Sequence, residues 1–244
     1  MGFLKKIYSL FLSVVLLSSC QHYYVAQYKA NEIKITDSLQ ANTPRMEAYI
    51  KPYRDSLAKE MNTVIAQNQH TLSKHAGESE LGNVLADAML KKAQQYSGKH
   101  VDFAMINLGG IRQPQLPAGN VTLGNIFELM PFDNMIVLLA LDGKTTKQFL
   151  DIMAVSGGLP ISGVRYTISN ETATVISFNG VPFDENKTYT LAISDYLANG
   201  GDKLDLLKKF KQQSTAKLMR DAFIEYFSEE KIINGKLDGR VIKQ

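Results

Sequence analysis

The sequence has 244 residues, of which 45% are hydrophobic and 21% are charged. This composition predicts a chain that buries a packed core, and it excludes an intrinsically disordered protein. The formal net charge of +3 is too small to indicate, by charge alone, binding to nucleic acid or to an anionic membrane surface.

The N-terminal residues have the pattern of a bacterial lipoprotein signal peptide. Lys5 and Lys6 precede an apolar run at 7–17, which is too short to cross a hydrocarbon core of ~30 Å. The run ends in Leu-Ser-Ser-Cys, which resembles the lipobox in which the cysteine, here Cys20, becomes the lipidated first residue of the mature protein. We therefore expect cleavage of residues 1–19 and anchoring to a membrane by acyl chains.

Cys20 is the only cysteine in the sequence. A disulfide within the chain is therefore excluded, and a metal site built from cysteines is disfavoured. The alternative interpretation of this residue is a free thiol buried in a core helix. The signal-peptide interpretation places the protein outside the cytoplasm, facing the periplasm or the cell surface. Gln21 is not the Asp that keeps some lipoproteins on the inner membrane, so the outer membrane is favoured.

Residues 20–42 are polar with a few aromatic residues, and they predict a tether that contains a short strand near Glu32–Ile35. Residues 43–244 contain no linker-like stretch and predict one domain. Its first helix is expected to start at Thr43-Pro44 and to kink or restart at Pro52. Apolar residues recur at three- and four-residue steps along one face of this helix: Met46, Ile50, Tyr53, Leu57, Met61 and Val64.

The next helix has the clearest pattern in the sequence. Glu78 and Glu80 near its start and Lys91 and Lys92 toward its end suit the helix dipole. Gly98 is expected to end it. Its apolar stripe consists of Leu81, Val84, Leu85, Ala88 and Met89.

The remainder of the chain alternates between strands and helices. This mixture predicts an α+β fold, a single compact domain of mixed sheet with helices, rather than a regular doubly wound sheet. Turns are indicated at Asp142-Gly143 and Asn179-Gly180. The expected strands are Val101–Ile106, Asn134–Leu141, Ile161–Ile168, Thr174–Phe178 and Tyr189–Ser194, and the expected helices are Leu123–Met130, Lys144–Met153 and Ala216–Phe227.

Two glycine-rich loops, Asn107–Arg112 and Tyr196–Asp202, each follow a predicted buried strand. Paired glycines let a backbone adopt positive φ and approach a ligand closely. Neither loop is a P-loop or a dinucleotide fingerprint, because GxxxxGK[ST] is absent and no GxGxxG follows a strand.

The polar residues of these loops suit a small anionic ligand that carries hydroxyl groups. Arg112 can clamp a phosphate, Asp202 can accept hydrogen bonds from a pair of ribose hydroxyls, and Asn107 can bind a base edge. Phe132 and Tyr196 could hold a flat base between two rings. The alternative is purely structural, because a Gly-Gly pair is usually a turn and a lone Phe usually belongs to the core.

Taken together, these segments resemble the C-terminal domain of the 5′-nucleotidase and UDP-sugar hydrolase family. The resemblance covers roughly residues 45–244, with the family's blocks in order and at similar spacings. The matching blocks are ESELGNVLADAML (Glu78–Leu90), NLGGIR (Asn107–Arg112), VTLGNIFELMPFDN (Val121–Asn134), ISGVRYTI (Ile161–Ile168) and SDYLANGGDKL (Ser194–Leu204).

The resemblance implies a compact α+β domain that binds the nucleoside part of a nucleotide. By this resemblance Phe132 and Tyr196 sandwich the base, although the second ring is commonly Phe in the family. Asn107 contacts the base or ribose, and Arg112 the ribose-phosphate side. Asp202 accepts from the ribose hydroxyls, and Gly163 supplies a backbone contact near the base.

The sequence departs from the family pattern at two places. Family members usually carry a further arginine shortly before the block that matches Glu78–Asn83, where this chain has Lys74 or His75 as the nearest equivalent. Neither residue offers a guanidinium fork for a phosphate. His75 alone is typical of a surface histidine. Leu108 replaces the first glycine of the usual NGGGIR.

In the family, hydrolysis is carried out by an N-terminal domain with two metal ions, whose ligands lie in patterns such as DxH and GNH[DE]. None of the four histidines, His22, His70, His75 and His100, lies in such a pattern. We therefore expect no catalytic residue and no cofactor in this chain. Divalent metals are expected in a separate metallophosphatase polypeptide, with which the chain forms a split 5′-nucleotidase of nucleotide catabolism.

Two alternatives remain open at this point. One is a non-catalytic lipoprotein that binds nucleosides or nucleotides for scavenging. The other is a structural remnant that binds nothing.

Overall fold

The computed structural model describes residues 44–244. The expected signal peptide at 1–19, the lipidated Cys20 and the tether at 20–42 lie outside the described residues. Residues 48–244 form one compact unit, and residues 44–47 begin the helix α2. Among the described residues, no helix combines the length and apolar character needed to cross a membrane.

The first predicted helix is confirmed as α2 (Pro44–Met61), which continues through Pro52. The assignment of Val64 to its apolar face is wrong. Val64 instead begins strand β1 (Val64–Asn68) and pairs with Thr122 of β5 (Gly119–Thr122). None of the residues of α2 is buried.

The second predicted helix is confirmed as α3 (Glu80–Ser97). Ser79 caps its first turn by accepting a hydrogen bond from the Gly82 N–H, and Gly98 ends it in the left-handed region at φ 63°. The predicted apolar stripe is buried. Lys92 is also fully buried, where its Nζ contacts Glu225 at 3.3 Å and Glu229 at 2.5 Å. Both carboxylates belong to α7 (Met219–Glu230), so the lysine ties α3 to α7.

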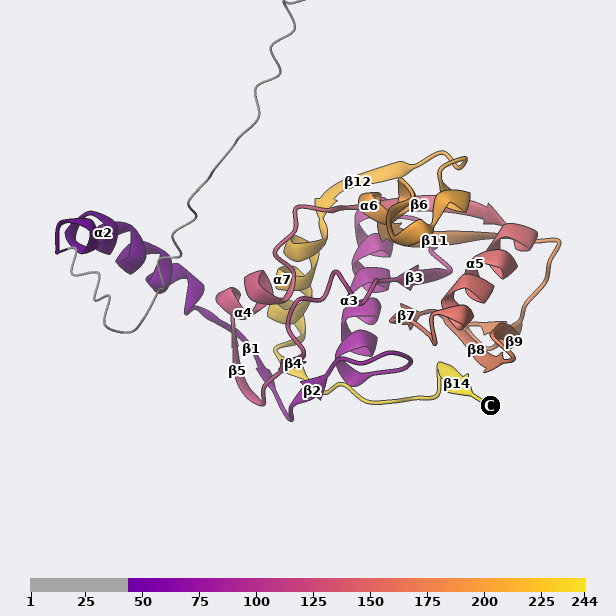
Figure 1. Ribbon diagram of the computed structural model, residues 1–244, viewed down its shortest axis with the longest axis horizontal. Coiled ribbons are helices and arrows are strands. Elements are labelled where there is room, and N and C mark those ends of the chain that lie inside the picture. The colour runs from indigo at the N-terminus through magenta and orange to yellow at the C-terminus, as the bar shows by residue number, and fades with distance from the viewer. Residues whose placement is uncertain (1–43) are drawn as a thin grey trace, which may run out of the picture. The chain divides into compact units, whose positions relative to one another are not determined.

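A five-stranded mixed sheet lies at the centre of the fold (Figure 1), with β11 parallel to β3 and antiparallel to β6. The order of its strands is β12 (Gln213–Leu218), β6 (Met135–Asp142), β11 (Thr188–Ser194), β3 (Phe103–Met105) and β7 (Ile161–Ser162).

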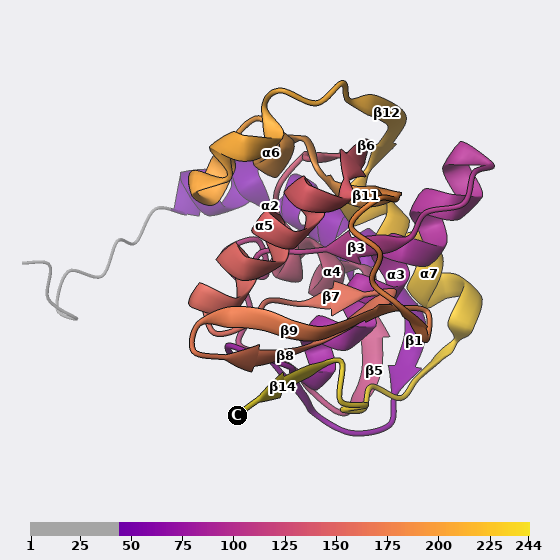
Figure 2. The same cartoon turned by 90° about the vertical axis from the view of Figure 1, so that its right-hand side faces the viewer.

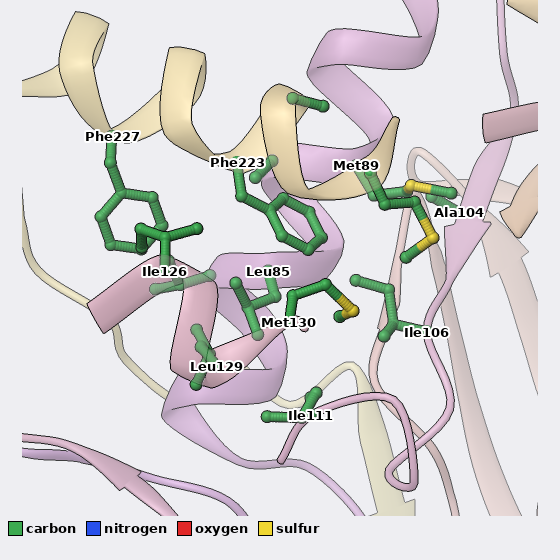
Figure 3. Close-up of a cluster of buried hydrophobic side chains, with 14 of the residues drawn as sticks. Leu85, Met89, Ala104, Ile106, Ile111, Ile126, Leu129, Met130, Phe223 and Phe227 are labelled. Carbon is green, nitrogen blue, oxygen red and sulfur yellow. The ribbon is translucent and has the colours of Figure 1, made fainter. Parts of the chain in front are cut away.

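Both faces of this sheet carry apolar side chains. Successive residues of a strand point to opposite faces, so a strand with consecutive apolar residues contributes to both. In β6, Ile136 and Leu138 belong to one hydrophobic cluster, whereas Val137 and Leu139 belong to the other. Figure 3 shows part of the first cluster, in which side chains of α3, α7 and α4 (Leu123–Leu129) pack together. A sheet that is buried on both faces has a fixed position, and so do the loops at its ends.

The second cluster packs α5 (Gly143–Val155) and a four-stranded sheet against the other face. Figure 2 shows strands β8 and β9 of that sheet beside α5. The order of the four strands is β10 (Val181–Pro182), β9 (Thr172–Phe178), β8 (Val164–Ser169) and β14 (Val241–Lys243). The remaining strands form two smaller sheets. One has the order β13 (Ile232–Ile233), β1 and β5, and the other pairs β2 (Leu72–Ser73) with β4 (Gln115–Leu116).

The structure confirms the α+β fold and differs from the predicted elements in local detail. The turn predicted at Asp142-Gly143 is wrong, because Asp142 caps α5 by accepting a hydrogen bond of 2.7 Å from the Thr145 N–H. The strand predicted over Ile161–Ile168 is interrupted at Gly163, which has φ +83°. The turn at Asn179-Gly180 is confirmed, with both residues at positive φ between β9 and β10.

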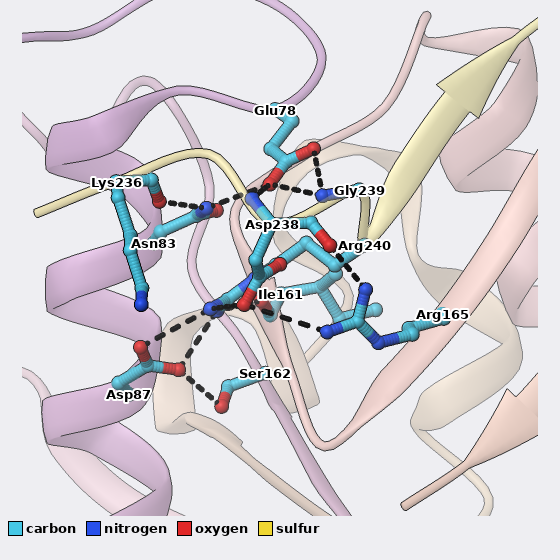
Figure 4. A network of polar contacts seen from close by, with 10 residues as sticks. All are labelled: Glu78, Asn83, Asp87, Ile161, Ser162, Arg165, Lys236, Asp238, Gly239 and Arg240. Atoms are coloured by element: carbon cyan, nitrogen blue, oxygen red, sulfur yellow. Dashed lines mark hydrogen bonds and ion pairs between the residues drawn. The ribbon is translucent and has the colours of Figure 1, made fainter. Parts of the chain in front are cut away.

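The C-terminal segment is fastened to α3 by the polar network in Figure 4. The Arg240 guanidinium donates to Asp87 at 2.7 Å and to Asp238 at 2.8 Å, and it reaches the carbonyl of Ile161 at 3.0 Å. Glu78 accepts from the backbone N–H groups of Asp238 and Gly239. The hydrogen bond from Arg240 holds the pKa of Asp238 below its ordinary value. The network therefore joins the segment that leads into β14 to α3 and β7.

We predict that Arg240→Met lowers the free energy of unfolding by about 2–3 kcal/mol, because it leaves two partly shielded carboxylates without their shared cation. Arg165→Met is the matched control. Arg165 also faces Asp238, but its side chain is 51% exposed against 11% for Arg240. We expect its replacement to cost less than about 1 kcal/mol. Urea unfolding followed by circular dichroism measures both, and equal losses would contradict this account of the network.

Candidate functional site

The central sheet brings three loops to one of its edges. The loop at 107–112 follows the C-terminal end of β3. The segment at 195–202 follows the C-terminal end of β11, and the prediction that it is a loop from Tyr196 is wrong in part, because it begins with the short helix α6 (Asp195–Ala198). Because β3 and β11 are parallel, these ends lie at the same edge. The segment 131–134 precedes β6, and β6 is antiparallel to β11, so its N-terminal end lies there too.

A cavity of about 380 Å³ opens between these loops, within the size range of small-molecule sites. It brings together five of the six residues that the sequence analysis assigned to substrate binding, and Gly163 is not among them. The lining residues are Asn107, Gly109, Gly110, Arg112, Phe132, Asn134, Tyr196 and Asp202. Phe132 is 37% exposed and Tyr196 is 49% exposed, so the alternative that Phe132 is a core residue is wrong.

The carboxylate of Asp202 connects the two glycine-rich loops. Its Oδ2 accepts a hydrogen bond of 2.7 Å from Asn107 Nδ2, and its Oδ1 accepts one of 2.9 Å from Tyr196 Oη. The hydrogen bond to Asp202 raises the pKa of the Tyr196 phenol. A carboxylate oxygen has two lone pairs, so each oxygen of Asp202 can accept a further hydrogen bond from a ligand. Asp202 itself lies in the left-handed region, at φ 52°.

Two residues that the sequence analysis did not single out hold the aromatic residues in place. Asp195 Oδ1 accepts from the backbone N–H groups of Met135 at 3.1 Å and Tyr196 at 2.8 Å, which ties the two aromatic segments together. Arg220 of α7 donates to Asp133 at 2.5 Å and to the Phe132 carbonyl at 3.4 Å. No local pattern indicates Arg220, since its partners lie 87 and 88 positions away in the sequence.

Glycine leaves room at two positions where side chains of the site pack against the backbone. A Cβ atom at Gly201 would lie 2.5 Å from the Tyr196 ring, and one at Gly110 would lie 2.7 Å from Asn107 Oδ1. Real Cβ atoms do not approach other atoms so closely. The glycines noticed in the sequence therefore make room for Tyr196 and Asn107.

Arg112 places a positive charge beside one of the aromatic rings. The carbon at the centre of its guanidinium lies 5.7 Å from the centroid of the Phe132 ring, within the range of a cation–π contact. Its Nη1 donates to the Gly109 carbonyl at 3.4 Å. The side chain is otherwise exposed, and its remaining donors are available to an anion at this end of the cavity.

Neither Lys74 nor His75 lines the cavity. Lys74 Nζ donates to the carbonyl of Ile111 at 2.6 Å and lies 3.5 Å from that of Leu108. It therefore holds the first glycine-rich loop through its backbone. His75 is exposed, and its Nδ1 lies 3.1 Å from the neighbouring Ala76 carbonyl.

Gly163 lies apart from the other predicted residues. It lines a different cavity, of about 350 Å³, together with Ser162, Arg165 and Asn179. A Cβ atom at this position would lie 2.2 Å from the Asp102 carbonyl. The close approach of Gly163 to Asp102, which leads into β3, accounts for a glycine here without a ligand.

More than half of the chain matches a known domain family. The model of the family described as "5'-nucleotidase, C-terminal domain" matches residues 59–209. This chain belongs to that family.

Relatives and solved structures agree with the assignment. A cell wall protein of Listeria monocytogenes, Lmo0130, is 30% identical over 68% of this chain and 24% of its own length. A 5′-nucleotidase of Vibrio vulnificus is 24% identical over 71% of this chain and 32% of its own length. The crystal structure of a 5′-nucleotidase precursor from Thermus thermophilus aligns with a TM-score of 0.70 and 28% identity, over 81% of this chain and 42% of that one. The chain thus spans about a quarter to two fifths of the length of these proteins.

The two-metal chemistry expected for 5′-nucleotidases needs metal-ligating side chains that are clustered in space. Within residues 44–244, no group of three or more His, Cys, Asp or Glu side chains is placed to hold a metal ion. The side chains of residues 44–244 therefore do not provide the ligand set of a two-metal centre.

We predict that Gly201→Ala displaces the Tyr196 ring and breaks its hydrogen bond to Asp202, because the added methyl group occupies the position of the ring. The ring is half exposed and can swing outward, so the cost in stability should stay below about 1 kcal/mol. Gly109→Ala is the control, since a Cβ atom there has its nearest contact at 3.6 Å. A crystal structure of each variant measures the ring position, and an unmoved ring in Gly201→Ala would show that this contact does not restrict Tyr196.

Proposed function

We propose that this domain recognises the nucleoside part of a nucleotide, as the substrate-binding component of a 5′-nucleotidase. The observation that carries the proposal is the cavity in which Asn107, Arg112, Phe132, Tyr196 and Asp202 converge from three loops. The 5′-nucleotidases among the relatives support a nucleotide ligand. The side chains of the cavity support it independently, because two aromatic rings suit a base, a carboxylate suits a sugar and a guanidinium suits a phosphate.

Each side chain has a distinct task in this proposal. Phe132 and Tyr196 provide ring faces for the base, where stacking stabilises a complex by ~1–3 kcal/mol per base. Asp202 accepts from the ribose hydroxyls through the lone pairs left free by Asn107 and Tyr196. Arg112 neutralises charge on the phosphate side.

Hydrolysis of the phosphate ester is assigned to a metal centre in a separate metallophosphatase polypeptide. In such a centre a metal ion lowers the pKa of its bound water, which supplies the nucleophile. The present domain would hold the base and sugar so that the phosphate is presented in one orientation. This would lower the entropic part of the activation barrier of hydrolysis. The two chains would together act in nucleotide catabolism.

The proposal includes an extracytoplasmic location. Residues 1–19 would act as a lipoprotein signal peptide, and Cys20 would carry the acyl chains, including palmitate, that hold the protein on a bacterial membrane, facing the periplasm or the surface. The outer membrane is favoured by Gln21. Mass spectrometry of the membrane fraction should find an acylated N-terminal peptide that begins at Cys20, and a Cys20→Ser variant should lack it.

We predict that Phe132→Ala and Tyr196→Ala each weaken adenosine binding about tenfold, because each removes one stacking face. Tyr196→Phe, which keeps the ring and loses only the contact with Asp202, should retain most of the affinity. Tyr53→Ala serves as the control, because Tyr53 is 63% exposed and does not line the cavity. Calorimetric titration measures the four variants. Unchanged binding in both alanine variants of the cavity would refute the stacking assignment.

We expect the soluble chain lacking residues 1–20 to release no phosphate from AMP above a protein-free control, with Mn²⁺ or Zn²⁺ present. A preparation of the Phe132→Ala/Tyr196→Ala double variant controls for contaminating phosphatase. Release by the wild-type chain that the double variant lacks would overturn the assignment of hydrolysis to a separate polypeptide. Adenosine binding without hydrolysis, even with candidate metallophosphatases added, would instead favour a scavenging role.

A further inference from the structure

A cavity of about 170 Å³ lies next to the candidate site and is distinct from the cavity at Gly163. It is called the second cavity below. Most of its lining residues are apolar, and the polar ones are Asn107, Ser156 and Asp202. Met105, Leu197 and Leu204 are buried behind this lining. Leu108, Ile152 and Leu159 are partly exposed, and they offer the apolar surface of the cavity. The apolar lining residues come from β3, the first glycine-rich loop, the end of α5 and the 197–204 segment, and they include Met105, Leu108, Met153, Leu159, Leu197 and Leu204.

This second cavity shares three of its lining residues with the candidate site: Asn107, Gly109 and Asp202. Asn107 and Asp202 are joined by the hydrogen bond of 2.7 Å. The hydrogen-bonded pair is therefore a common wall of the two cavities. A ligand that contacts Asp202 from the site lies beside this second cavity.

The size and chemistry of the second cavity restrict what it can hold. An apolar cavity of about 150 Å³ in another protein stays dry and binds benzene. The carboxylate of Asp202 in its wall disfavours a phosphate, and the partly exposed Leu108, Ile152 and Leu159 offer no partner to a polar group. The cavity therefore suits an apolar group of about the size of one aromatic ring.

We propose that this cavity is a subsite for an apolar group carried on a sugar hydroxyl of the bound nucleoside or nucleotide. The inference rests on the proposed function, in which Asp202 accepts from the two ribose hydroxyls. A substituent on one hydroxyl begins at the shared wall and extends over Leu108 and Leu159, while the other hydroxyl still donates to Asp202. The domain thereby accepts sugar-esterified nucleosides in addition to unmodified ones.

The test uses adenosine that carries an N-methylanthraniloyl ester on its 2′ or 3′ oxygen, whose fluorescence rises in apolar surroundings. We expect enhanced fluorescence with the soluble chain and displacement of the probe by adenosine. The probe should bind about tenfold more tightly than adenosine, since burial of an aromatic ring adds apolar contact.

Ser156→Phe provides the decisive variant, because Ser156 is exposed at the C-terminal end of α5 and lines only the second cavity. We expect the phenylalanine to fill the subsite and weaken probe binding about tenfold, with adenosine affinity unchanged within about twofold. Val155→Phe is the matched control, since Val155 is 64% exposed and lines neither cavity. It should leave both affinities unchanged.

The outcomes separate this inference from the proposed function. Adenosine binding without probe binding, probe binding that adenosine does not displace, or equal effects of Ser156→Phe on both ligands would overturn the subsite alone. Failure of both ligands to bind the wild-type chain would overturn the proposed function together with the subsite. Preserved adenosine affinity in Ser156→Phe also demonstrates that the variant is folded.

Discussion

The pairing of β3 with β11 in parallel, and of β11 with β6 in antiparallel, is the constraint on which the site depends. These directions place the ends of β3 and β11 and the start of β6 at one sheet edge, so that segments far apart in sequence converge. Hydrophobic clusters on both faces fix the sheet. A one-residue slip of any of these strands would exchange the side chains that pack into its two hydrophobic clusters.

Polar contacts then set the detail of the site on this rigid base. Asp202 receives hydrogen bonds from Asn107 and Tyr196, and Asp195 joins the backbones of Met135 and Tyr196. Asp202 adopts positive φ, as does its neighbour Lys203, and non-glycine residues in that region carry a conformational cost. The hydrogen bonds of Asp202 offset this cost, and each of its oxygens keeps a lone pair that can accept a further hydrogen bond.

Much of the fold and of the site could be predicted because their signals are local. The stripe of α3, the buried run of β6 and the glycines after β3 and β11 follow from periodicity and turn chemistry, and they brought Asn107, Phe132 and Tyr196 into one hypothesis. What was missed depends on distant partners. Residues 213–218 form a strand because they pair with β6, which delays the helix predicted from Ala216 until Met219. Arg220 and the buried Lys92 likewise acquire their roles only through tertiary contacts, and the glycine at 163 serves packing against Asp102.

The most direct test of the account is a crystal structure of the soluble chain with adenosine. We predict the base between the rings of Phe132 and Tyr196, with at least one ribose hydroxyl within hydrogen-bonding distance of Asp202. Adenosine bound in the cavity at Gly163 and Arg165, or bound with either ring turned away from the base, would contradict the central claim that the converging loops form the recognition site.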